Sequence, residues 1–145
     1  MSRQSFASLT LSVRAPVAIL LVAALSGCFG GTVALLEATT GRDVWRMALN
    51  TPIAAGAGSD GKVVAVVTKA NDVVALQDGR EIWRQKLGAQ VFTAPLVAGA
   101  RVFVLAADRS VNAFDGQTGR KLWSQQRPTE PLVLRQSGVL RAVGD

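Results

Sequence analysis

Short apolar stretches separated by turn residues run along most of the chain, and they lack the spacing of amphipathic helices. Each stretch alternates apolar and polar positions or is wholly apolar, and Gly, Asp, Asn or Ser bound it. In the later half of the chain this pattern predicts strands at 91–99, 101–107, 111–115 and 120–126. The preceding residues repeat it, with predicted strands at 52–58, 62–70, 73–77 and 80–87. The chain is therefore predicted to be all-β, in four-stranded antiparallel units.

A tryptophan closes each unit. The segments "ALLEATTGRDVWR" (34–46), "ALQDGREIWR" (75–84) and "AFDGQTGRKLWS" (113–124) share a turn ending in Gly-Arg and then the Trp. Trp45, Trp83 and Trp123 are thus about 40 residues apart, which is typical of a β-propeller blade. We expect these side chains to pack between neighbouring blades as structural residues.

The first and last units are predicted to be incomplete. Residues 31–45 contain only the third and fourth strands of a blade, and residues 131–145 only the first strand and the start of the second. Because a propeller closes with about 4 to 8 blades, about three blades' worth predicts a fragment, or a gene with an internal deletion. Unpaired sheet edges would make such an array prone to self-association.

The N-terminus has the order of an export signal. Arg3 and Arg14 occur without an acidic residue, and an apolar run of 11 residues (15–25) is about half of what a membrane span needs. The ending "LSGC" places the single cysteine, Cys28, where a bacterial lipoprotein is cleaved and acylated. We expect a lipoprotein signal peptide at 1–27, a lipidated N-terminus at 28–31, and partial β-propeller repeats over 32–145.

Composition excludes most site chemistry. The chain has no His, so it has no imidazole base or ligand, and one Cys cannot form an internal disulfide. Without the two arginines of the signal, 14 basic residues face 10 acidic ones, a net charge of +4. These bases are scattered through turns and strand ends, so we expect a solvated surface and no nucleic-acid partner. The aspartates beside turns are expected to bond their own backbone rather than to act as acids or bind calcium.

With its lipobox, its blade motif and the segment "VLRQSGVLRAVGD" (133–145), the chain resembles the BamB family, the propeller lipoproteins of the outer-membrane β-barrel assembly machine. The resemblance implies a fold of eight blades, so about three blades' worth is a partial chain. It implies a non-enzymatic scaffold without cofactor, catalytic or metal sites, anchored in the outer membrane and facing the periplasm. Its implied partners are the periplasmic domains of BamA, the other subunits of the machine, and unfolded outer-membrane proteins.

A partner site is expected where the repeat changes. At 11 and 12 residues after each Trp the first two units have small residues or Pro, whereas the third has Leu134 and Arg135. An extended segment would place Leu132 and Leu134 on one face and Arg135 on the other, while a loop could project all three together. On the repeat alone, an equally good alternative is that Leu132 and Leu134 belong to a core strand and that Arg135 is a solvated charge. The resemblance favours a docking site for BamA, because a Leu-x-Leu-Arg segment has that association in the family.

The alternative function is a fragment of a quinone-dependent propeller dehydrogenase, a class that shares the blade motif. Resemblance to that class implies a much longer chain with an adjacent Cys pair, a calcium site and a Trp beneath the cofactor. The chain has one Cys, at the lipobox, so the sequence favours the scaffold.

Overall fold

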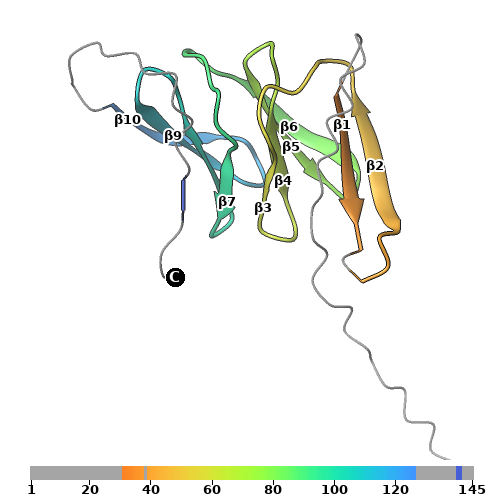
Figure 1. Cartoon of the computed structure of the whole chain (residues 1–145). Helices are drawn as coiled ribbons and strands as arrows, with labels where there is room; N and C mark the ends of the chain where they lie inside the picture. Colours follow the sequence, from red (N-terminus) through yellow and green to blue (C-terminus); the bar gives the residue numbers. More distant parts are fainter. Residues whose placement is uncertain (1–30, 38, 127–139, 142–145) are drawn as a thin grey trace, which may run out of the picture.

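Three antiparallel β-sheets stand side by side in the computed structural model, which describes residues 31–37, 39–126 and 140–141 (Figure 1). Ten strands lie within these residues. They are β1 (Gly31–Leu36), β2 (Asp43–Leu49), β3 (Gly58–Ser59), β4 (Val64–Val67), β5 (Asp72–Gln77), β6 (Arg80–Lys86), β7 (Leu96–Ala98), β8 (Arg101–Leu105), β9 (Ser110–Asp115) and β10 (Lys121–Gln126). The fold is that of a partial β-propeller.

Each sheet is a meander in which consecutive strands pair. β1 pairs with β2 (the first blade), β3 to β6 form the second blade, and β7 to β10 form the third. The turn between β5 and β6 has two residues, Asp78 and Gly79, with φ of 50° and 73°. Positive φ at both positions is the hairpin geometry that matches strand twist, and it favours Gly at the second. The outer hairpin of the second blade is therefore tight, whereas the β1–β2 and β9–β10 turns are longer.

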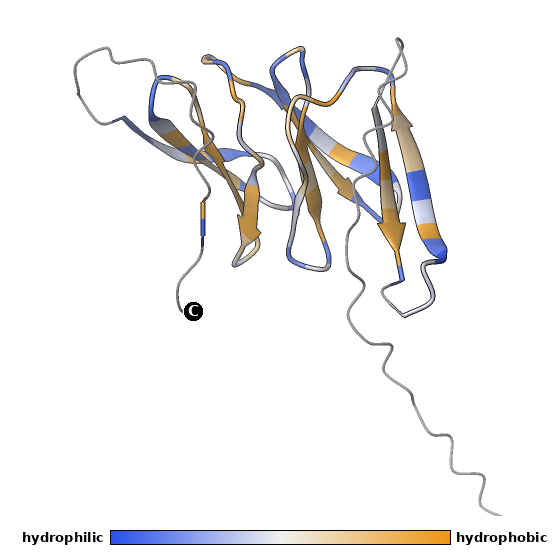
Figure 2. Ribbon diagram, viewed as in Figure 1, coloured by the Kyte–Doolittle hydropathy of each residue, from blue (hydrophilic) through white to orange (hydrophobic). Residues whose placement is uncertain are grey.

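The core lies between the sheets rather than within any one of them. The cluster between the first and second blades includes Val33, Leu49, Val66 and Leu76, with Trp45 packed against it. A second cluster joins the second blade to the third. Figure 2 shows the apolar residues along the strands between sheets and the hydrophilic ones mainly on the outer strands and turns. Because each blade buries its face only against a neighbour, the array is stabilised blade by blade.

The innermost strands are shorter than the sequence predicted. The strand expected at 52–58 is reduced to β3 and one isolated bridge between Ile53 and Thr68, and that expected at 91–99 to β7. The reason is close backbone approach between the second and third blades. A Cβ at Gly58 would lie 2.0 Å from the carbonyl oxygen of Pro95. Segments that meet a neighbouring backbone so closely leave little room for a regular, side-chain-bearing strand.

Asn71 fixes the connection between the second and third blades. Its φ is 67°, a left-handed conformation that Asn tolerates better than most residues. Its side-chain amide donates to the carbonyls of Leu87 and Ala89 at 3.0 and 2.8 Å. Its Oδ1 accepts the N–H of Val91 at 3.2 Å. These bonds set where the third blade begins relative to the second.

Candidate functional site

The tryptophans of the first and second blades each pack on the turn of the next blade. Trp45 packs on Gly79, where an added Cβ would lie 3.2 Å from the Trp45 Cβ. Trp83 packs on Gly119, where an added Cβ would lie 2.6 Å from the indole Cδ2. Both glycines have positive φ and close the turn before the outer strand. The repeated Gly and Trp of the sequence motif are therefore two halves of one contact between blades.

Trp83 makes the more complete of these contacts. Its side chain is 8% exposed, and the indole Nε1 donates to the carbonyl of Gly116 at 2.9 Å. The ring also stands 6.1 Å from the ring of Phe114, centroid to centroid. Trp45 is half-buried and, among the described residues, donates no side-chain hydrogen bond. The second and third blades are thus joined by apolar contact together with a directed bond.

Trp123 occupies the same register on the third blade, but it is 45% exposed. Cross-strand pairing places Val67, Val73 and Gln85 side by side on the second blade, and it places Leu105, Val111 and Gln125 side by side on the third. Val67 and Val73 are fully buried under the third blade, whereas Leu105 and Val111 are only half-buried. We call the five residues of this surface the third-blade face: Phe103, Leu105, Val111, Trp123 and Gln125.

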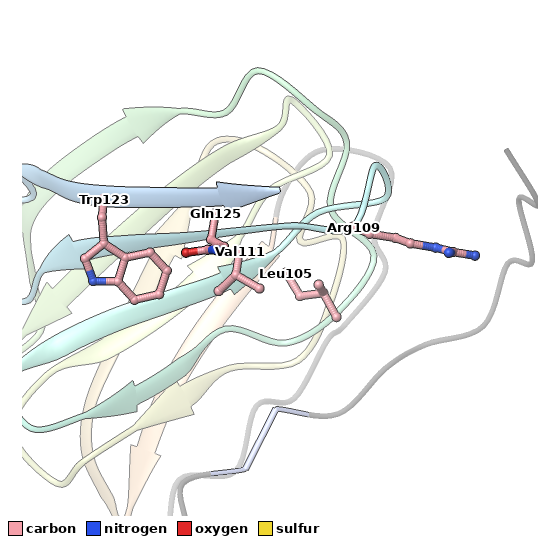
Figure 3. A pocket seen from close by; sticks show the side chains of 5 residues that line it. All are labelled: Leu105, Arg109, Val111, Trp123 and Gln125. Atoms are coloured by element: carbon pink, nitrogen blue, oxygen red, sulfur yellow. The ribbon is translucent and has the colours of Figure 1, made fainter. Parts of the chain in front are cut away.

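The third-blade face is hollowed. Leu105, Val111, Trp123, Gln125 and Arg109 line an open groove of about 440 Å³ (Figure 3). Figure 3 shows the Arg109 side chain extending away from the other four. Phe103 supports the Trp123 ring, with the two centroids 6.0 Å apart. The groove is therefore mainly apolar, with one amide and a cation at its margin, which suits a protein surface better than a small charged ligand.

Asp60, Asp108 and Asp115 bond local backbone, as the sequence predicted, whereas the carboxylate of Asp72 pairs with Arg84 and Lys86 instead. Asp60 accepts the N–H groups of Lys62 and Val63 at 3.0 and 2.9 Å. The backbone N–H of Thr118, 2.8 Å from Asp115 Oδ1, is the main cause that lowers the pKa of Asp115.

At the turn between β8 and β9, the hydroxyl of Ser110 lies 2.6 Å from Asp108 Oδ1 and is the main cause that lowers the pKa of Asp108. The backbone N–H of Ser110 donates to the same oxygen at 2.9 Å and adds to this effect. The lowered pKa values of Asp108 and Asp115 are thus a consequence of their role as turn formers.

Other chemistry is sparse in the part of the chain that the structure describes. There, no three acidic, His or Cys side chains gather as metal ligands would. No helix among the same residues has the length and apolar character to cross a membrane. The two functional sites predicted from sequence, Cys28 and the Leu132, Leu134 and Arg135 segment, lie outside the described residues.

The site that sequence reasoning missed is the third-blade face. Trp123 carries the same motif as Trp83, so its exposure could not be read from the repeat. One signal was available: where the second blade has Ala65 and Val67, the third has the larger Phe103 and Leu105 at the same register. Larger apolar residues on a face indicate a different contact from the one between the second and third blades.

Comparison with known proteins agrees with this fold. Residues 30–145 match the sequence model of a family described as outer membrane protein assembly factor BamB. The BamB of Burkholderia pseudomallei is 36% identical over 116 residues, which are 79% of this chain and 30% of that protein. The chain therefore spans about a third of this relative's length.

Solved structures show the same architecture. BamB from Moraxella catarrhalis is similar with a TM-score of 0.58 and 21% identity, over 76% of this chain and 38% of that one. A europium-containing methanol dehydrogenase has a TM-score of 0.58 and 18% identity, over 76% of this chain and 23% of that one. At these identities both likenesses show the fold alone.

Proposed function

The chain belongs to the BamB family of outer membrane protein assembly factors, and we propose that it is a non-enzymatic lipoprotein scaffold for the assembly of outer-membrane β-barrel proteins. The observation that carries this proposal is the family match, which extends over residues 30–145. On this proposal the chain binds BamA, with the other subunits of the machine and unfolded client proteins as further partners. It is anchored in the outer membrane and faces the periplasm.

The described structure supports a binding role. Its surface offers exposed sheet and turn faces, and the third-blade face is a mainly apolar groove of a kind that protein partners cover. A fragment of a quinone-dependent dehydrogenase is the second candidate, favoured by the likeness to the methanol dehydrogenase structure. The assembly role is preferred because the family match rests on sequence along the chain, whereas that likeness is one of fold.

The proposed BamA site is the segment with Leu132, Leu134 and Arg135. A Leu pair beside an Arg suits an interface, because apolar burial and a charge-assisted bond act together there. The test is capture of the BamA periplasmic domains by the full-length chain carrying Leu134→Ala with Arg135→Glu. The matched charge control is Arg101→Glu, since Arg101 is exposed on β8.

Loss of capture by the paired variant, with capture retained by the Arg101→Glu control, is the expected result. Undiminished capture by the paired variant, with an unchanged circular dichroism spectrum, would remove the segment from the site. Absence of capture by the unaltered chain would instead contradict the scaffold function. Tight stoichiometric binding of a redox quinone would favour the dehydrogenase.

The proposed anchor is acylated Cys28. Cleavage before Cys28 would remove the apolar run at 15–25, so stable anchoring of the cleaved chain requires the acyl chains. Cys28→Ala should leave the protein unprocessed or soluble in the periplasm, and fractionation of cell membranes measures this. A variant that stays in the outer-membrane fraction in full amount would contradict the anchor.

A further inference from the structure

The strands of the three blades end on two opposite sides of the array, and these sides differ in what they carry. We call one side the connection end, because it carries the connections between blades (residues 50–57 and 87–95) together with the β4–β5 and β8–β9 turns. We propose that the connection end lies on the lipid surface of the membrane that holds acylated Cys28. The proposal depends on the lipid anchor of the proposed function, and it adds an orientation and a lipid-contacting surface to it.

Backbone hydrogen bonds gather the connections and turns of this end. The N–H of Lys69 donates to the carbonyl of Pro52 at 2.8 Å, so the β4–β5 turn meets the connection from the first blade to the second. The N–H of Ala107 donates to the carbonyl of Gln90 at 2.7 Å, so the β8–β9 turn meets the next connection. The β1–β2, β3–β4 and β7–β8 turns lie on the opposite side (Figure 1). Because paired strands alternate in direction, the β5–β6 and β9–β10 turns lie there too, and we call that side the turn end.

The first strand starts at the connection end. The N–H of Gly31 donates to the carbonyl of Thr51 at 3.2 Å, and a Cβ at Gly31 would collide with the side chain of Ile53. Gly31 is three residues after Cys28. Since an extended chain spans at most about 3.6 Å per residue, the acylated residue stays within about 11 Å of this end.

The turn end is too far from the anchor to touch the same membrane in an upright array. β6 has seven residues, which at about 3.3 Å each make a strand about 23 Å long, twice the reach of the tether. An array lying on its outer strands would also fit the tether. There, however, the ion pairs of Arg46 with Asp43 and of Arg84 with Glu81 would lose hydration against lipid. The connection end is therefore the favoured contact.

The connection end has the composition of a surface that tolerates lipid. Its two connections contain no charged residue, and its two turns add only Lys69, Asp108 and Arg109. A charge-poor surface loses less hydration at a membrane than a charged one does. Lys69 is exposed and has no ion-pair partner among the described residues, so its ammonium group is available to a lipid phosphate.

The turn end has the opposite character. Each of its hairpin turns contains or adjoins charged residues, which are Glu37 and Arg42, Asp60 and Lys62, Asp78 and Arg80, Arg101, and Asp115 and Arg120.

The exposure of the connection end does not come from a missing neighbour. The second blade has a described blade on either side, and Ala54 and Ala70 at its connection end are nevertheless exposed. Blades pack through the faces of their sheets, so a further blade would extend the connection end sideways without covering it.

The experiment measures which end approaches lipid, with the acylated full-length chain in vesicles of phosphatidylethanolamine and phosphatidylglycerol. Because Cys28 is the single cysteine and its thiol is acylated, one introduced Cys takes a fluorescent label. Ala70→Cys at the connection end and Lys62→Cys at the turn end are a matched pair in the second blade. Ala107→Cys and Gln117→Cys are the corresponding pair in the third, and all four positions are exposed.

Lipids that carry a nitroxide on the headgroup should quench the labels of the Ala70→Cys and Ala107→Cys chains and leave those of the turn-end chains bright. In the Ala107→Cys chain, Lys69→Glu should lower the quenching, because the anionic lipid then repels this end. Lys62→Glu makes the same change of charge at the turn end and should leave the quenching as it was.

Three results would overturn the proposal. Equal quenching at both ends would show an array on its side, and stronger quenching at the turn end would show the reverse orientation. Quenching unchanged by Lys69→Glu would show that this end does not contact the headgroups. A chain that does not float with the vesicles would contradict the lipid anchor itself, and the orientation with it, so flotation separates the two failures. Circular dichroism of each purified variant verifies that the sheets are retained.

Discussion

Removing Trp83 should separate the second blade from the third more than any other single truncation at a blade tryptophan. Its ring contacts Phe114 and the backbone of Gly119, and its indole N–H is bonded to Gly116 O at 2.9 Å. Both the apolar contact and the bond cross from one sheet to the next. Trp83→Ala therefore takes away contact between blades, while β6 keeps its pairing with β5.

The magnitude follows from burial. Truncating a buried Trp to Ala costs about 3–5 kcal/mol of unfolding free energy, because a cavity remains where the ring was. Trp83→Phe keeps a ring but loses the hydrogen bond, and it leaves the Gly116 carbonyl without that donor. This change should cost about 1–3 kcal/mol of unfolding free energy. Trp123→Ala removes an exposed ring whose described partner is Phe103, so about 0.5–1.5 kcal/mol is expected.

Urea unfolding of the full-length chain, followed by far-ultraviolet circular dichroism at low protein concentration, measures these differences. The expected order of destabilisation is Trp83→Ala, then Trp83→Phe, then Trp123→Ala. The Phe variant keeps the comparison possible if the Ala variant does not fold. A Trp83→Ala chain no less stable than Trp123→Ala would refute the reasoning, since burial and the cross-blade bond would then contribute nothing.

Three other changes test the contacts around this interface, each by the same unfolding measurement. Gly119→Ala should cost at least about 1 kcal/mol more than Gly99→Ala, because both positions have positive φ but only the first would press a Cβ into Trp83. Asn71→Ala should cost about 2–3 kcal/mol, since it loses three hydrogen bonds that hold the connection between blades. Asp115 has a lowered pKa, so its contribution to stability is present above its unfolded pKa of about 3.9 and is lost as pH falls through the folded value. Asp115→Asn should therefore flatten the loss of stability with acid, and an unchanged acid profile would contradict this assignment.

Local patterns predicted the strands and turns of this chain well, because the information lies within a few residues. Alternating apolar positions located the outer hairpins, and Gly before each outer strand marked a turn with positive φ. The innermost strands were predicted too long. Their length depends on how closely Gly58 approaches Pro95 of the neighbouring blade, a contact between residues far apart in sequence. The spacing of apolar residues and the turn residues are local features, so they do not predict that distance.

The third-blade face was not predictable for a related reason. Trp83 and Trp123 have the same local sequence pattern, and what distinguishes them among the described residues is that a following turn supplies a glycine to Trp83. Burial at such a position is a property of the next blade. The predicted sites at Cys28 and at Leu134 with Arg135 rest on motif and family resemblance, and they stay predictions.

The length of the turn that each tryptophan contacts explains why Trp45 and Trp83 differ in burial and in hydrogen bonding. Trp45 meets the two-residue turn of Asp78 and Gly79, is half-buried and donates no side-chain hydrogen bond among the described residues. Trp83 meets a longer turn, in which the Gly116 carbonyl accepts its indole N–H. Replacing the β9–β10 turn with the Asp-Gly turn of the second blade should therefore cost about 1–3 kcal/mol of unfolding free energy, because the indole N–H of Trp83 would lose its acceptor while a glycine would still face the ring. A urea midpoint as high as that of the unaltered chain would show that turn length does not set the strength of this contact.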